Sequence, residues 1–181
     1  MIRRIVCFDG ESNGLHGEVF AVGGVVLDAA TGREESTFYA RAPDPVGADP
    51  WVAEHVIPRL GPELTHPTVR TMREAFWAWL RWQMGQGDGV WVLVDCGWPV
   101  EAGLLSACVA DDPSRAFGGP YPLHEVATLL LSAGHDPLAS YADRVLSPEA
   151  LASHRKHHPV DDARVSALCA RMALTVTTES R

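Results

Sequence analysis

Carboxylates and a histidine are concentrated in three short segments that lie far apart in the sequence. They are Asp9 and Glu11, Asp95 and Glu101, and His157 and Asp162. Residues two apart in an extended strand face the same side, so Asp9 and Glu11 are expected to point together. Adjacent carboxylates raise each other's pKa unless a cation neutralises them. This set of residues therefore predicts a divalent-cation site.

Each segment also has a simpler interpretation. The first can be a solvated strand end with an Asp-Gly turn. Asp95 can be a turn residue that binds backbone amides, and Glu101 can complement a helix N-terminus. Asp161 and Asp162 can complement the dipole of the last helix. All of these would have to hold at once, which favours the shared site.

Four short apolar runs predict the strands that would position these residues, at 3–8, 19–27, 35–41 and 90–94. Turns join the first three runs, so they predict an antiparallel meander of two hairpins. The run at 90–94 is continuously apolar, which is typical of a central strand. Asp9 and Asp95 directly follow two of these strands, and the working edge is expected where those strand ends converge.

Helical patterns alternate with these strands. We expect helices at 51–60, 68–84, 99–109, 147–152 and 159–174, and at 123–132 after a short extended entry. The order of elements predicts an α/β fold with a mixed sheet flanked by helices. A length of 181 residues indicates a single domain. We place it at 1–174, with 175–181 as a loose tail.

Two of the three segments resemble motifs of the DEDDh 3′–5′ exonuclease family. The run Phe8–Leu15 (FDGESNGL) is similar to the first motif, an apolar residue followed by D-x-E, Ser or Thr, any residue, and Gly-Leu. His157–Ala163 (HHPVDDA) is similar to the third, H-x4-D-A, with Pro159 where a small residue is usual. The run 51–60 (WVAEHVIPRL) further resembles a subgroup of small bacterial exoribonucleases. The family implies a ribonuclease H-like fold, here with the three-strand meander continued by parallel strands.

The second motif of that family departs further from its usual form, H-N-x-x-F-D-x-x-F-L. Glu101, followed by two leucines at the expected spacing, stands where Asp is usual. Cys96 and Gly97 replace the His-Asn pair, and Asp95 just before them is a substitute or auxiliary acid. In the third motif, His158 and Asp161 are the alternatives if the alignment is shifted by one residue.

The resemblance implies hydrolysis of phosphodiesters with two Mg²⁺ or Mn²⁺ ions, for which hard oxygen ligands are suited. It gives Asp9 as the ligand of both ions, with Glu11 and Asp162 completing one site. Glu101 would act indirectly, through water. His157 would take a proton from the attacking water, since its ordinary pKa of about 6.5 suits that role.

The resemblance further implies that the partner is a single-stranded 3′ end, of RNA rather than DNA. Ser12 and Asn13 would hydrogen-bond the terminal nucleotide, and Leu15 would stack under its base or simply pack within its loop. Two other functions stay open. One is a catalytically decayed ribonuclease H-like protein that binds nucleic acid or acts as a scaffold. The other is a metal-dependent phosphohydrolase of small nucleotides.

Composition restricts the remaining possibilities. Lys and Arg total 15 and Asp and Glu total 23, which gives a net charge of −8 and excludes a broad basic face for duplex nucleic acid. The four cysteines form no C-x-x-C pair, and no apolar run is long enough for a signal peptide or a membrane span. We expect a cytoplasmic protein with reduced thiols. Trp77 and Trp82 lie off the apolar stripe of their helix, which predicts a homodimer surface or a covering loop.

Overall fold

Five strands form a mixed sheet in the computed structural model, which describes residues 2–179 and the side chains of 2–175. The strands are β1 (Arg4–Ser12), β2 (Val19–Asp28), β3 (Glu34–Arg41), β4 (Val90–Val94) and β5 (His124–Glu125). Their order is β3-β2-β1-β4-β5. The β1–β2 and β2–β3 pairs are antiparallel, and the β1–β4 and β4–β5 pairs are parallel. The predicted fold class, a three-strand meander continued by parallel strands, is confirmed.

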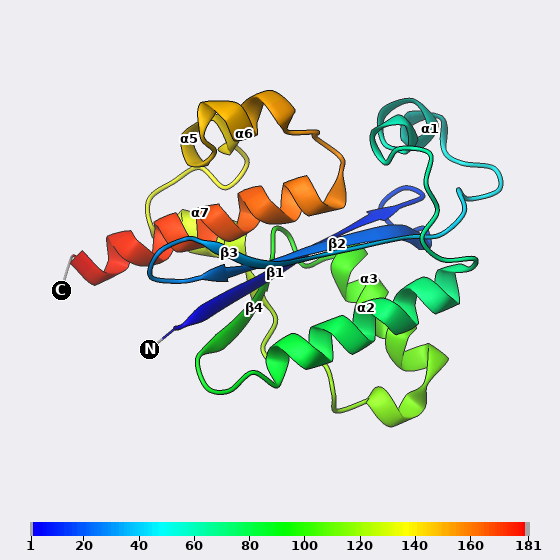
Figure 1. The fold of residues 1–181 in the computed structure, drawn as a ribbon, viewed down its shortest axis with the longest axis horizontal. Coiled ribbons are helices and arrows are strands. Elements are labelled where there is room, and N and C mark those ends of the chain that lie inside the picture. Colours follow the sequence, from blue (N-terminus) through cyan, green and yellow to red (C-terminus); the bar gives the residue numbers. More distant parts are fainter. Residues whose placement is uncertain (1, 180–181) are drawn as a thin grey trace.

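Helices cover both faces of this sheet (Figure 1). Helices α2 (Val69–Met84) and α3 (Val100–Asp111) cover one face, and α4 (Val126–Ser132) and α7 (Pro159–Glu179) cover the other. Shorter helices connect them: α1 (Pro50–His55), η1 (Ile57–Arg59), η2 (Pro113–Arg115), α5 (Ala142–Val145) and α6 (Pro148–Ser153). None of the helices in the described residues is long and apolar enough to span a membrane.

The alternation of side chains along β1 decides where its acids point. Val6 and Phe8 are buried on the face of α2 and α3, while Ile5 and Cys7 are buried on the face of α7. Because successive residues of a strand alternate, the odd-numbered positions that follow share the side of α7. Asp9 and the position two residues later therefore face the helix that carries Asp162.

Several element boundaries differ from the sequence prediction. β1 continues through Ser12, where a turn was expected from residue 10, because Glu11 still pairs with Ala21 of β2. The helix predicted at 51–60 divides at Val56, and a 3-10 turn containing Pro58 follows. The helices α5 and η2 lie in segments that show no helical pattern in the sequence.

The predicted loose tail at 175–181 is wrong for the described part. Helix α7 continues to Glu179, five residues past the predicted end at 174, and residues 180–181 lie outside the described range. Neither Gly nor Pro follows Leu174 to end the helix. The Thr175 hydroxyl also donates to the Arg171 and Met172 carbonyls of the preceding turn, at 3.2 and 2.8 Å.

Two consecutive glycines in β2 let helices approach the sheet from opposite sides. A Cβ atom on Gly23 would lie 2.3 Å from backbone atoms of Pro159 and Val160, at the start of α7. A Cβ atom on Gly24 would lie 2.2 Å from the Trp79 ring of α2. Gly23 is paired with Asp9 across the β1–β2 ladder. The absence of a side chain at this position therefore sets how closely the start of α7 lies to Asp9.

We expect Gly23→Ala to lower the free energy of unfolding by about 2 kcal/mol, because backbone atoms of α7 would have to move away from an added methyl group. Gly103→Ala is the matched control, since nothing lies within 4 Å of its added Cβ and it sits inside α3. That control should gain up to about 1 kcal/mol from helix propensity. Urea unfolding of both variants checks this. Equal stability of Gly23→Ala and the wild type would contradict the close approach.

The two off-stripe tryptophans have different surroundings. Trp77 is only 8% exposed, because the segment after α3 covers it: the Arg115 guanidinium lies 5.6 Å from its ring centre. Trp82 is 67% exposed. A neighbouring segment therefore covers Trp77, as one of the two interpretations expected. Of the two tryptophans, only Trp82 is exposed enough to contribute to the predicted homodimer surface.

Candidate active site

The structure brings together Glu11, His157 and Asp162 at the carboxyl end of β1. One ligand atom from each lies within 4.8 Å of the others. Glu11 comes from β1, and Asp162 comes from the first turn of α7. His157 belongs to the loop that leads into this helix. Asp9 precedes Glu11 by two positions on the same face of the strand. Segments about 150 residues apart in the sequence thus supply one cluster of oxygen and nitrogen ligands.

The loop before α7 holds His157 in an unusual conformation. Its φ is +65°, the left-handed region that non-glycine residues rarely adopt. This conformation lets the His157 backbone N–H donate to Asp162 Oδ2 at 2.8 Å. The His157 ring meets the edge of Trp51 of α1, with 5.2 Å between ring centres. The loop before α7 is therefore fixed by two contacts, the hydrogen bond to Asp162 at the start of α7 and the ring contact with Trp51 of α1.

Both candidates for the third acid lie close to this cluster. Glu101 is 6% exposed at the start of α3, and its Oε1 accepts from the Gly10 backbone N–H at 3.4 Å. Asp95 follows β4 and lines a cavity with Asp9 and Asp162. The Gly97 N–H donates to Glu125 at 2.8 Å, so Glu125 holds the turn that was an alternative role for Asp95.

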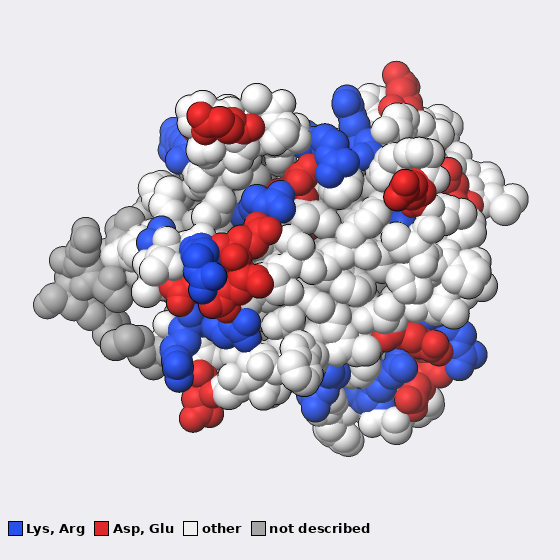
Figure 2. All heavy atoms as spheres, viewed as in Figure 1, with Lys and Arg blue, Asp and Glu red and all other residues white. Residues whose placement is uncertain are grey.

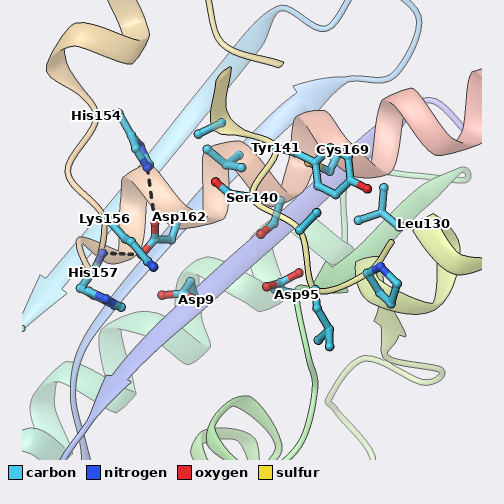
Figure 3. Close-up of a pocket in the computed structure, with 16 residues that line it drawn as sticks. Asp9, Asp95, Leu130, Ser140, Tyr141, His154, Lys156, His157, Asp162 and Cys169 are labelled. Carbon is cyan, nitrogen blue, oxygen red and sulfur yellow. Dashed lines mark hydrogen bonds and ion pairs between the residues drawn. The ribbon is translucent and has the colours of Figure 1, made fainter. Parts of the chain in front are cut away.

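The cavity has a volume of about 380 Å³ and opens beside the carboxylates. Figure 3 shows Asp9, Asp95 and Asp162 pointing into it from β1, the end of β4 and α7. Its far wall is formed by Leu130, Tyr141 and Cys169, among others. The carboxylates thus meet at one end of a cavity whose other end is more apolar.

Burial and mutual repulsion raise the pKa values of the clustered acids. Desolvation is the main cause for each, followed by neighbouring carboxylates for Asp9 and Glu11. The pKa of Asp9 lies well above its ordinary value, and that of Glu11 is about 8. The pKa values of Glu101 and Asp162 are each about 7. No Lys or Arg within the described residues forms an ion pair with any of these four acids. A divalent cation with hard oxygen ligands fits this uncompensated charge.

His157 has the opposite shift. Desolvation lowers its pKa below the ordinary value, and the nearby positive charges of Lys156 and Arg59 lower it further. The imidazole is therefore neutral at neutral pH and has a lone pair free to accept a proton.

The raised pKa values predict how metal-free stability depends on pH. Each clustered acid binds a proton more tightly in the folded than in the unfolded chain, so the folded state takes up protons between about pH 4.5 and 8. The free energy of unfolding should therefore fall as pH rises through this window. Urea unfolding in EDTA at pH 5, 6.5 and 8 measures it. A free energy of unfolding that rises from pH 5 to pH 8 would contradict the presence of a carboxylate cluster without compensating positive charge.

The three predicted substrate-binding residues lie at the end of β1 and in the β1–β2 connection, and two of them already have protein partners. The Ser12 hydroxyl donates to the Gly14 carbonyl at 2.7 Å. The Asn13 side-chain carbonyl accepts from the Asp49 N–H at 2.7 Å, which ties α1 to this loop. Leu15 is 69% exposed, so its side chain is available to a ligand.

Two site residues were missed by the sequence analysis. His154 lines the cavity, with its Nε2 3.8 Å from Asp162 Oδ1. Its position in the same loop as His157 was the available signal. Glu125 is the second, and only the pairing of β5 with β4 places it beside Gly97.

The shifted alternatives for the third motif occupy different surroundings. His158 is buried and stacked on Tyr39, with 5.1 Å between ring centres. Asp161 accepts from Arg155 and Arg164, at 3.0 and 2.8 Å. Neither residue lines the cavity beside Asp9. This arrangement favours His157 and Asp162.

Comparison with known proteins relates this geometry to one class of fold. No family model matches the chain, and no curated protein matches its sequence. Among solved structures, the nuclease domain of 3′hExo, a DEDDh family member bound to rAMP, is similar with a TM-score of 0.56 and 14% identity. The match covers 96% of this chain and 92% of that domain.

Two further structures belong to longer chains. Cell-death related nuclease 4 is similar with a TM-score of 0.52 and 14% identity, over 96% of this chain and 64% of that one. E. coli exonuclease I, in a zinc-bound complex with single-stranded DNA, has a TM-score of 0.54 and 15% identity. The match covers the whole of this chain and 42% of exonuclease I. The chain has the ribonuclease H-like fold of DEDDh 3′–5′ exonucleases, as the motifs implied.

Proposed function

We propose that this chain is a metal-dependent 3′–5′ exonuclease that hydrolyses phosphodiester bonds at single-stranded 3′ ends, of RNA rather than DNA. The observation that carries the proposal is the convergence of Glu11, His157 and Asp162 within 4.8 Å, beside Asp9, on a fold shared with such enzymes. The preference for RNA rests on the resemblance of residues 51–60 to small bacterial exoribonucleases. We place the whole activity in one domain, which includes α7 through Glu179.

Asp9, Glu11 and Asp162 are the residues that would hold Mg²⁺ or Mn²⁺, with Asp9 shared between two ions. When bound, such ions neutralise charge at the attacking and leaving oxygens of the phosphodiester. Glu101 adds negative charge from the other face of the sheet and acts through water. The neutral His157 imidazole takes the proton of the attacking water. Its fixed backbone conformation keeps the ring at the edge of the carboxylate cluster.

The 3′ nucleotide would bind next to the β1–β2 connection. Leu15 is exposed enough to stack under a base. Ser12 would use its oxygen as an acceptor, since its proton is given to Gly14. Asn13 would use its amide nitrogen, since its carbonyl oxygen accepts from Asp49.

His157→Ala is expected to lower kcat by about 10³-fold, because the proton acceptor is removed. The free energy of unfolding should change by less than about 0.5 kcal/mol, since Ala has the same difficulty with a positive φ. His158→Ala should instead lose about 1–2 kcal/mol of stability through its contact with Tyr39 and keep most of its turnover. Turnover and urea unfolding of both variants check this. An active His157→Ala with an inactive, folded His158→Ala would shift the third motif by one residue.

End-labelled oligonucleotides test the function itself. Purified protein with Mn²⁺ or Mg²⁺ should shorten a 5′-labelled single strand stepwise, and release the label from a 3′-labelled one in the first step. Binding without turnover would support the alternative of a catalytically decayed protein that only binds nucleic acid. That alternative is motivated by Glu101 in place of Asp and by the missing His-Asn pair of the second motif. Turnover of mononucleotides alone would support the small-molecule phosphohydrolase.

A further inference from the structure

Most cationic side chains in the described part of the chain are already neutralised or hydrogen-bonded. Arg73 bridges Asp111 and Glu18, and the Arg164 guanidinium bridges Glu34 and Asp161. The exceptions, with no hydrogen bond or ion pair from the side chain, are Arg3, Arg59, Arg144 and Lys156. Arg144 lies over the Tyr141 ring. A cation without a protein partner keeps its full attraction for a polyanion, so these positions matter in a chain with a net charge of −8.

Two of these exceptions flank His157 from different elements. Lys156 precedes it in the loop and lines the cavity with Asp162. Arg59 ends η1, which directly follows α1, the helix whose Trp51 meets the His157 ring. Trp51 of α1 connects the two sides, because it stacks on His55 at 5.0 Å and meets His157 at 5.2 Å between ring centres. In Figure 2, Lys and Arg atoms gather between α6 and α1, above the sheet.

A nucleic-acid strand that binds at the acidic cluster needs positive charge nearby, because the carboxylates repel its phosphates. Bound cations would offset the repulsion between the carboxylates and the scissile phosphate, but not the charge of phosphates farther along the strand. Those phosphates need cationic partners of their own, and charged hydrogen bonds to phosphate are among the stronger polar contacts. Unpaired cations occur beside His157 on one side of the cluster, and Arg144 lies at the Tyr141 wall of the cavity on the other.

We infer that Arg59 and Lys156 form a binding site for backbone phosphates upstream of the scissile bond, so that the strand runs between α1 and the loop before α7. The inference rests on the proposed exonuclease function and specifies its substrate. The chain would prefer oligonucleotides with several phosphates over a dinucleotide, whose only phosphodiester is the scissile one.

The test compares Arg59→Gln, Lys156→Gln and the double variant on a pentanucleotide and a dinucleotide, with Mn²⁺. Each single change should raise KM for the pentanucleotide about tenfold, as removal of a charged hydrogen bond implies. The ratio of the KM of each variant to that of the wild type should fall toward 1 for the dinucleotide. The slope of log KM against log salt should become shallower by roughly 0.7 for each cation that no longer binds a phosphate.

Two arginines serve as matched controls. Arg33→Gln removes a side chain that is 73% exposed in the β2–β3 turn and should leave both substrates unaffected. Arg144→Gln removes an unpaired arginine near the opposite end of the cavity. A larger rise in KM for Arg144→Gln than for Arg59→Gln would overturn the inferred path. An equal rise in KM on both substrates for Lys156→Gln would place Lys156 at the scissile phosphate and overturn its upstream role.

Failure of the proposed function would be recognisable separately, because the wild type would then turn over neither substrate. In that case, fluorescence anisotropy with a labelled pentanucleotide in Ca²⁺ still tests the phosphate site. About tenfold weaker binding of Arg59→Gln than of Arg33→Gln would support it. Equal binding of the two variants would overturn it.

Discussion

Asp9→Asn should abolish turnover, by at least about 10³-fold, and at the same time make the metal-free protein more stable. Burial and surrounding carboxylates, including Glu11, Asp162 and Glu101, raise the pKa of Asp9 well above its ordinary value. An amide of the same shape carries no charge, so it removes repulsion from the folded state. It also removes the ligand that both cations would share, which deprives the reaction of most of its charge neutralisation.

Thermal unfolding with EDTA and with Mn²⁺ separates these two effects. In EDTA at pH 8, Asp9→Asn should have a higher Tm than the wild type, and the difference should shrink at pH 5, where the acids bind protons. With millimolar Mn²⁺, the wild type should gain Tm and the variant should gain much less, because binding stabilises only a competent folded site. The control Asp88→Asn, at an exposed loop position, should behave as the wild type. A variant that is less stable in EDTA, or that still gains from Mn²⁺, would contradict the proposed role of Asp9.

The sequence was sufficient to predict those parts of the site that depend on local periodicity. Period-two alternation placed Asp9 and Glu11 on one face, and the structure extends β1 far enough for both to be in the strand. The helix start at Pro159 placed Asp162 within its first turn. The pairing directions within the sheet also followed from the element order, because short turns require antiparallel pairing and longer helical connections permit parallel pairing.

Features that depend on contacts between distant segments could not be predicted in this way. The close approach of α7 to β2 requires a residue without a Cβ atom at position 23. This requirement becomes visible only when the two backbones are placed side by side. The hydrogen bond from Gly97 to Glu125 requires the pairing of a two-residue strand, which is too short to give a periodic signal. The covering of Trp77 by the segment around Arg115 likewise joins elements that no local pattern relates.

Sequence and structure leave two candidates for the third acid, Glu101 and Asp95, and Glu101→Gln should distinguish between them. Glu101 is buried beside Gly10, and its pKa of about 7 leaves it mostly ionised at pH 8. The glutamine amide keeps an oxygen for the Gly10 N–H but removes the charge. We expect kcat to fall about 100-fold at pH 8, a barrier increase of roughly 2.7 kcal/mol. Metal-free stability should not decrease, since a buried charge has been removed.

Asp95→Asn should have a smaller effect on turnover, below about tenfold, although its side chain lines the same cavity. Desolvation and Glu125 raise the pKa of Asp95, but no side-chain hydrogen bond to it occurs among the described residues. Its replacement should therefore change stability little. Glu125→Ala is the informative control, because it removes the acceptor of the Gly97 N–H and should therefore affect stability more. kcat and Tm of the three variants at pH 8 give the answer. If Asp95→Asn is inactive and folded while Glu101→Gln turns over normally, Asp95 is the third acid, and the carboxylate cluster is completed from the end of β4 rather than from α3.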